Sequence, residues 1–277
     1  MSSIDAPTTR AGVIPARRKL ALPERSLGLL GLVTLAGVLE LLPRTGLVSD
    51  RYFPPFSAMV GALVDAMGRP EFWSATGQTL QAWGIGLAIA LAAGVGLGLL
   101  TGSVPVVARL TASTIEFLRP VPSVALIPLA VLVFGTTNIR STLLLIVYAA
   151  FWQVLIQTIY GVRDVDPVAR ETARSYQLGR WARLRHLVWP TALPYVMTGV
   201  RLGAAVALIL AVTAGIVGIG QGLGWLIVKA QSGNDVASVY GLVLFTGLLG
   251  VLVNLLARAL ERRALAWHSS VRADLGG

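Results

Sequence analysis

Few side chains in this sequence could carry out catalysis or hold a metal ion. The 277 residues contain no cysteine and only two histidines, His186 and His268, which lie far apart in the chain. A thiol nucleophile, a disulfide and a zinc cluster are therefore excluded. The phosphate-binding pattern G-x-x-x-x-G-K-[ST] does not occur either, so we do not expect the chain to hydrolyse ATP. We predict no catalytic residue, no metal site and no cofactor in this chain.

One pair of opposite charges lies inside an apolar run. Glu116 and Arg119 are three residues apart, and Pro120 and Pro122 follow them directly. Ionisable side chains at membrane depth are costly and usually face the protein interior or water. At this spacing on a helix the two side chains either form an ion pair with each other or line a transport pathway. In both cases the prolines should bend or unwind the helix.

A polar segment separates two apolar runs and reads DVDPVARETARSYQLGRWARLRHLVWPTALP from residue 164 to residue 194. Pro167 suits the first turn of a helix, and Asp164 and Asp166 favour its N-terminus. After a turn at 177–179, a second short basic helix would lead to Pro190, which can open the next apolar helix. A polar helix–turn–helix cannot be buried in lipid. It is either a plain surface loop or a docking element for a soluble partner.

Glycines recur at two different spacings. Gly94, Gly98 and Gly102 follow Ala90 at intervals of four residues, a pattern that lets membrane helices pack closely. Between residues 218 and 224 every second residue is glycine, which disrupts helical order. Non-helical backbone at membrane depth persists only where it is buried in protein or lines an aqueous cavity. This segment is therefore either a re-entrant or gating loop or an ordinary flexible external loop.

The composition places all of these features in a membrane protein. Hydrophobic residues make up 55% of the chain, charged residues only 13%, and the mean hydropathy is +0.73. Soluble domains carry about 25% charged residues, so a soluble fold and an intrinsically disordered chain are both excluded. Six apolar runs are candidate membrane spans, and a short amphipathic helix at 56–67 could lie on the membrane surface. The predicted spans are 27–42, 79–101, 106–134, 142–161, 191–219 and 236–257.

The net charge of +10 has two interpretations. A strongly basic chain can bind nucleic acid, but basic residues also accumulate on the cytoplasmic side of membrane proteins. Across six spans, 17 of the 23 Lys and Arg residues fall on one side and 5 on the other. We therefore predict a multi-pass protein of the plasma (inner) membrane, in contact with lipid and not with nucleic acid, with both termini in the cytoplasm.

The polar segment resembles the EAA loop of ABC-type importer permeases, and the chain resembles the nitrate, sulfonate and taurine branch of that family. Glu171-Thr172-Ala173 matches the EAA triplet, and Pro190 follows Glu171 at the family's interval of nineteen residues. The resemblance covers roughly residues 70–265. Further matches are Leu193-Pro194, Leu118-Arg119-Pro120-Val121-Pro122, Ile127-Pro128-Leu129, Phe134-Gly135 and Gly222-Leu223-Gly224.

This resemblance implies an all-α bundle of six spans with the type I importer permease fold. It also implies two ABC ATPase subunits that carry ATP–Mg, an external solute-binding protein, and a second permease copy, for which a homodimer is favoured over a heterodimer. The implied regions are a cytoplasmic tail (1–25), a first span with its external connection (26–69), the permease domain (70–265) with a coupling loop at 163–189, and a second tail (266–277). The implied ATPase-coupling residues are Glu171, Thr172, Ala173, Arg174, Gln177, Gly179, Arg180 and Pro190.

The sequence departs from the family pattern at two positions. The glycine expected six residues after Glu171 is replaced by Gln177, and the nearest glycine is Gly179, so the tight turn could be displaced. Relatives also often carry an acidic residue in the fifth span where this chain has Gly215. The candidate pathway or gate residues are Glu116, Arg119, Gly215, Gly222 and Gly224.

The branch implies a small substrate, with a nitrate-, sulfonate- or taurine-like anion as the first expectation and a vitamin precursor or an aromatic acid as the alternative. A membrane enzyme and a scaffold without transport are the competing classes. The scarcity of nucleophiles and metal ligands opposes the enzyme, and the EAA-like loop opposes the scaffold.

Overall fold

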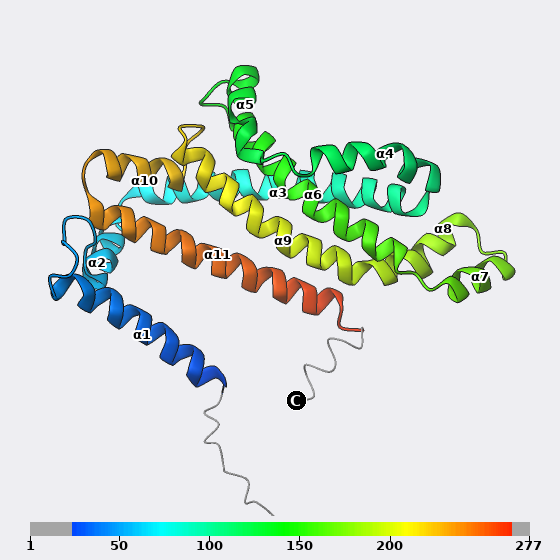
Figure 1. Ribbon diagram of the computed structural model, residues 1–277, viewed down its shortest axis with the longest axis horizontal. Helices are drawn as coiled ribbons and strands as arrows, with labels where there is room; N and C mark the ends of the chain where they lie inside the picture. Colours follow the sequence, from blue (N-terminus) through cyan, green and yellow to red (C-terminus); the bar gives the residue numbers. More distant parts are fainter. Residues whose placement is uncertain (1–23, 268–277) are drawn as a thin grey trace, which may run out of the picture.

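The computed structural model describes residues 24–267, and every regular element in that part of the chain is helical (Figure 1). The predicted all-α class is therefore confirmed. The N-terminal half contains α1 (Glu24–Arg44), α2 (Phe56–Met67), α3 (Pro70–Ser103), α4 (Pro105–Leu118), the 3₁₀ turn η1 (Ser123–Leu126), α5 (Ile127–Phe134) and α6 (Ile139–Arg163). The C-terminal half contains α7 (Pro167–Ser175), α8 (Arg180–Arg183), the π-turn η2 (Leu184–Val188), α9 (Trp189–Ile216), α10 (Leu223–Ser232) and α11 (Val236–Ala264).

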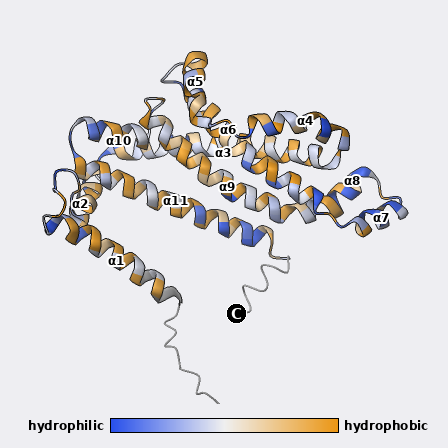
Figure 2. Ribbon diagram, in the orientation of Figure 1, coloured by the Kyte–Doolittle hydropathy of each residue, from blue (hydrophilic) through white to orange (hydrophobic). Residues whose placement is uncertain are grey.

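Four of these helical stretches are long and apolar enough to cross a membrane, namely 70–103, 139–163, 180–216 and 236–264. The broken pair formed by α4 and the 123–134 stretch passes the same test as a fifth span, with a bend of 86°. The described residues therefore give four or five spans, and the predicted number of six is not confirmed. Figure 2 shows apolar residues along the long helices and hydrophilic residues concentrated in α7 and α8 at one end of the bundle.

The core of the bundle is built from α3, α6 and α9, with small residues of one helix set against β-branched residues of the next. A Cβ added to Gly94 would lie 2.8 Å from Cβ of Val154, and one added to Gly98 would lie 2.6 Å from Cβ of Thr158. Val154 is fully buried, and Gly203 of α9 packs on its other side. The predicted packing role of the glycines on α3 is confirmed, because only glycine lets the two backbones approach this closely.

The third apolar run is bent at its prolines, as predicted. Helix α4 ends at Leu118, and α5 begins only after the short turn η1. Because Pro122 has no N–H, it cannot donate to the carbonyl of Leu118. The hydroxyl of Tyr148 in α6 donates to this carbonyl at 2.6 Å, as does the amide of Val121 at 3.1 Å. These bonds hold the end of α4 against α6, while α5 projects from the bundle (Figure 1).

The predicted helix at 56–67 forms with those bounds and packs against α11, while its position on the membrane surface stays a prediction. Met59 and Leu63 are buried, and a Cβ at Gly241 of α11 would lie 2.7 Å from the carbonyl oxygen of Met59. Pro55 at the N-cap offers no side-chain acceptor. The carboxylate of Glu40 in α1 supplies it instead, because the amide of Ser57 donates to Oε2 at 2.8 Å.

Candidate functional site

The polar segment between α6 and α9 forms two short helices joined by a tight turn, as predicted. Asp166 is the N-cap of α7, and its side chain accepts a hydrogen bond of 2.8 Å from the amide of Val168. Pro167 occupies the first helical position, where its missing N–H costs nothing. Cap and proline together define where α7 begins.

The turn that follows α7 is centred on Gln177 and not on Gly179. Gln177 has φ 51°, whereas Gly179 has φ −59° and ψ 161°, which any residue can adopt. The amide of Leu178 donates to the carbonyl of Ala173 at 3.0 Å, and that of Gln177 to the carbonyl of Arg174 at 2.8 Å. This pair of bonds is a Schellman cap. The turn has therefore kept its place without the family's glycine, and Gln177 adopts a left-handed conformation.

The base of this loop is tied to the membrane helices. The guanidinium of Arg170 donates to the carbonyl of Val162 in α6 at 2.6 Å, and Ala173 is buried. The hydroxyl of Tyr195 in α9 donates to Asp164 Oδ2 at 3.0 Å. On the other side, α8 continues through the π-turn into α9, where Pro190 lies in the first turn. The two helices are thus anchored to α6 and α9.

The outward side of the loop is both charged and apolar. Glu171, Thr172, Arg174 and Arg180 are exposed, and Thr172 uses its hydroxyl to bond the carbonyl of Val168 within α7. Three apolar or aromatic side chains are also largely exposed, and sequence reasoning about charges missed them. They are Val168 (69% exposed), Tyr176 (78%) and Trp181 (71%). The signal in the sequence is the presence of large apolar side chains in a short polar segment. A group of such side chains that is exposed in the single chain usually marks a surface that a partner protein covers.

The structure does not pair Glu116 with Arg119. Both side chains are exposed, and the ion pairs found in the described residues do not include either of them. The ion-pair prediction is therefore wrong for the single chain. Arg119 is the C-cap of α4 and still has helical backbone angles (φ −53°, ψ −44°), so the backbone permits the pair but the two side chains do not meet. A pathway role for the two residues stays a prediction.

The three candidate gate glycines are buried at the contact between α9 and α10. A Cβ at Gly215 would lie 2.8 Å from the amide nitrogen of Trp225, and one at Gly224 would collide with the carbonyl oxygen of Val212. Gly222 has φ 139°, and the next amide, that of Leu223, donates to Thr79 of α3 at 2.9 Å. Residues 222–224 are packed against protein, whereas Gly218 and Gln221 are exposed, and the re-entrant or gating role and the external position of the segment stay predictions.

The packing at Gly215 also explains the second departure from the family pattern. The space that an acidic side chain would need is filled by the backbone of α10, so glycine is required by this helix contact.

Comparison with known proteins identifies the family. The family model described as "Binding-protein-dependent transport system inner membrane component" matches residues 94–265, more than half of the chain. The chain belongs to this family. Its members are permease subunits of ABC importers, and the resemblance of the EAA-like segment is thereby confirmed.

Curated relatives place this permease in the predicted branch. It is 30% identical to the taurine transport system permease protein TauC of Escherichia coli, over 82% of this chain and 84% of the relative. It is 32% identical to the putative aliphatic sulfonates transport permease protein SsuC of Bacillus subtilis, over 64% of this chain and 65% of that relative. The nitrate import permease protein NrtB of Leptolyngbya laminosa is 26% identical, over 70% and 69% of the two chains.

Solved structures support the fold. A chain of the MetNI methionine ABC transporter in an inward-facing conformation superposes with a TM-score of 0.62 at 16% identity, covering 71% of this permease and 98% of that chain. A chain of an amino acid ABC transporter crystallised with histidines gives a TM-score of 0.59 at 19% identity, covering 70% and 94%. The predicted importer permease fold is therefore confirmed.

Proposed function

We propose that this permease forms the membrane pathway of an ATP-driven importer, in which two cytoplasmic ATPase subunits bind ATP–Mg and the permease itself hydrolyses nothing. The observation that carries the proposal is the anchored helical pair α7–α8, which presents an exposed charged and aromatic surface outside the membrane helices. A groove on each ATPase subunit would cover Tyr176 and Trp181 and pair with Glu171, Arg174 and Arg180.

The anchoring explains how ATPase movement would reach the pathway. The Arg170 bond to α6 and the continuous run from α8 into α9 oblige α7 and α8 to move with those two helices. Helix α9 packs closely on α6 at Gly199 and Gly203. The two helices would therefore tilt together as one packed unit. Closure of the ATPases would then change which side of the membrane the bundle opens to.

A second permease copy would complete the pathway, and the same chain is favoured over a diverged one. Helix α4 has no buried residue, and Leu110, Phe117 and Leu132 are 76%, 74% and 84% exposed. Lipid can cover these apolar side chains, but a single bundle would leave the charges of Glu116 and Arg119 facing lipid, which is costly, and a second copy would cover them. Two copies would also offer the two ATPases one coupling loop each.

The proposed substrate is a small anion of the sulfonate, taurine or nitrate type, delivered by an external solute-binding protein. The support is the similarity to relatives named as permeases for aliphatic sulfonates, taurine and nitrate. A vitamin precursor or an aromatic acid is the alternative.

The test is ATP hydrolysis by the complex of permease, ATPase and binding protein in nanodiscs. Trp181→Ala should lower hydrolysis stimulated by the loaded binding protein about tenfold or more, as expected for an aromatic anchor at an interface. Tyr52→Ala, which removes a side chain that is 71% exposed near the opposite end of the bundle, is the matched control. Equal stimulation in the wild type and in Trp181→Ala would refute the coupling role.

The proposed orientation, with both termini and the α7–α8 loop in the cytoplasm, has its own test. The chain lacks cysteine, so Ser175→Cys in α7 and Ser232→Cys at the end of α10 create single labelling sites. An impermeant thiol reagent added to intact cells should label position 232 and spare position 175. The reverse pattern would contradict the orientation.

A further inference from the structure

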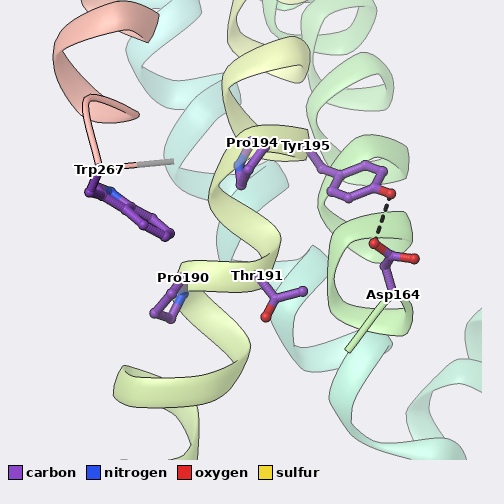
Figure 3. A pocket seen from close by; sticks show the side chains of 6 residues that line it. All are labelled: Asp164, Pro190, Thr191, Pro194, Tyr195 and Trp267. Atoms are coloured by element: carbon purple, nitrogen blue, oxygen red, sulfur yellow. Dashed lines mark hydrogen bonds between the residues drawn. The ribbon is translucent and has the colours of Figure 1, made fainter. Parts of the chain in front are cut away.

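A cavity of about 450 Å³ opens at the root of the coupling loop, and none of the functions discussed above uses it. Its lining comes from the end of α6 (Asp164), the first turns of α9 (Pro190, Thr191, Pro194 and Tyr195) and the segment after α11 (Trp267). Figure 3 shows the Trp267 ring on one side of the α9 turns and the bonded pair Asp164–Tyr195 on the other. Its volume lies within the range typical of small-ligand sites.

The chemistry of the lining selects a cation with N–H donors. Asp164 supplies the one carboxylate in the cavity, and the Tyr195 hydroxyl donates to its Oδ2, which leaves Oδ1 available. None of the ion pairs in the described part of the chain involves Asp164. The hydroxyl of Thr191 donates to the carbonyl of Leu187, so its lone pairs can still accept.

A further acceptor follows from the two prolines of α9. Pro194 has no N–H, so the carbonyl of Pro190 cannot accept the usual helical bond from the residue four positions on. A carboxylate, a hydroxyl and this carbonyl together match the three N–H donors of a primary ammonium group. A divalent metal is a poor fit, since the described residues contain no group of three or more His, Asp or Glu side chains.

The position of the cavity indicates where such an ammonium group would come from. The cavity lies at the ends of three membrane helices, beside the polar α7–α8 pair, and therefore at the level of the lipid headgroups in the proposed orientation. Trp267 stands at its edge, and tryptophan favours the membrane–water interface. We propose that this cavity binds the primary ammonium of a zwitterionic lipid headgroup of the phosphatidylethanolamine type, with the ammonium at Asp164 and the lipid ester region near Trp267.

A headgroup bound there would touch α6, α9 and the end of α11 at once. Helices α6 and α9 carry the α7–α8 pair, so the lipid would stabilise one position of this pair relative to the end of α11. The inference uses the proposed orientation but not the transport activity.

The experiment compares two lipids with the same net charge and acyl chains, in which methyl groups replace the N–H donors and enlarge the headgroup; the loss of preference in Asp164→Asn separates the donor effect from the size effect. Full-length permease, purified with its partners, is equilibrated with dioleoyl phosphatidylethanolamine or with dioleoyl phosphatidylcholine, and retained lipid is counted by native mass spectrometry. The methylated headgroup keeps the charge but cannot donate to Asp164. We expect about tenfold better retention of the ethanolamine lipid, the ratio given by one charge-assisted hydrogen bond.

Three variants separate the carboxylate charge from the fold. Asp164→Asn keeps an oxygen acceptor for Tyr195 and should abolish the preference. Tyr195→Phe keeps the charge and should retain the preference, as should Asp65→Asn, which removes an exposed carboxylate on α2. Equal retention of both lipids by the wild type, or an undiminished preference in Asp164→Asn, would overturn the proposal. Displacement by free ethanolamine without any lipid preference would overturn the assignment to a lipid.

Discussion

Replacing Gln177 by glycine should stabilise the coupling loop, although glutamine is the better helix former. Gln177 has φ 51°, and its amide and that of Leu178 close the Schellman cap of α7. A residue with a Cβ loses about 1–2 kcal/mol in this conformation. Glycine avoids that cost but loses more chain entropy on folding, about 0.5–1 kcal/mol. The net gain for Gln177→Gly is therefore about 0.5–1 kcal/mol.

Hydrogen exchange of the segment 173–178, followed by mass spectrometry on the purified complex, measures this gain locally. A gain of about 0.5–1 kcal/mol slows exchange through local opening by roughly two- to fivefold. Helix α7 has nine residues, so its C-terminal cap contributes a large share of its stability. Gln177→Val should accelerate exchange, because a β-branched residue is poorly tolerated at positive φ.

Two matched controls follow from the same geometry. Gly179→Ala should change little, since its φ is −59° and no atom lies within 4 Å of the added Cβ. Asn234→Gly, in the equivalent cap of α10 with φ 56°, should gain less than Gln177→Gly because asparagine already tolerates this conformation. Faster exchange in Gln177→Gly, or a loss of structure in Gly179→Ala alone, would show that the turn lies at 179 and would refute the reasoning.

Three further changes test the packing. Gly98→Ala should lower stability by about 1–3 kcal/mol, because the new Cβ lies 2.6 Å from Cβ of Thr158; Gly96→Ala on the same helix, with no atom within 4 Å, should leave the melting temperature unchanged or raised. Glu40→Ala, which removes the acceptor of the Ser57 amide, should accelerate hydrogen exchange at the start of α2, and unchanged exchange would argue against this cap. Gly215→Glu should abolish the α9–α10 contact and destabilise the fold by about 3 kcal/mol or more. Size-exclusion chromatography of the detergent-purified protein should then show a loss of monodisperse material, and a normal elution profile would contradict the prediction.

The sequence predicted the helices and the packing glycines because these depend on local pattern. Spacing of Gly94, Gly98 and Gly102 identifies the packing face of α3, but it cannot name Val154 or Thr158 as the residues that fill it. The apolar runs could likewise be located from their composition. The 86° bend in the third run could not, because it depends on which donors bond to the backbone carbonyls that the prolines leave without a helical partner.

The sequence predicted where the candidate site lies in the chain, but it predicted only part of the surface that the site presents. The EAA-like triplet and Pro190 located the coupling loop, and Asp166 and Pro167 fixed the start of α7. Apolar and aromatic side chains in this polar segment signal a surface that a partner covers. The pattern does not say that Tyr176 and Trp181 are the exposed ones, because an aromatic side chain can point either way until the segment is anchored. The role of Glu40 was similarly hidden, since its partner Ser57 lies in another helix.

Cross-linking from the coupling loop tests the central claim most directly. A single cysteine introduced by Ser175→Cys into this cysteine-free chain gives one defined attachment point at an exposed position of α7 and leaves Trp181 in place. In membranes containing the assembled transporter, a short thiol-reactive cross-linker at position 175 should join the permease to an ATPase subunit, with the yield changing when ATP is added. Tyr52→Cys near the opposite end should give no such product. Efficient ATPase cross-linking from position 52, or none from position 175 in a complex that still transports, would contradict the account.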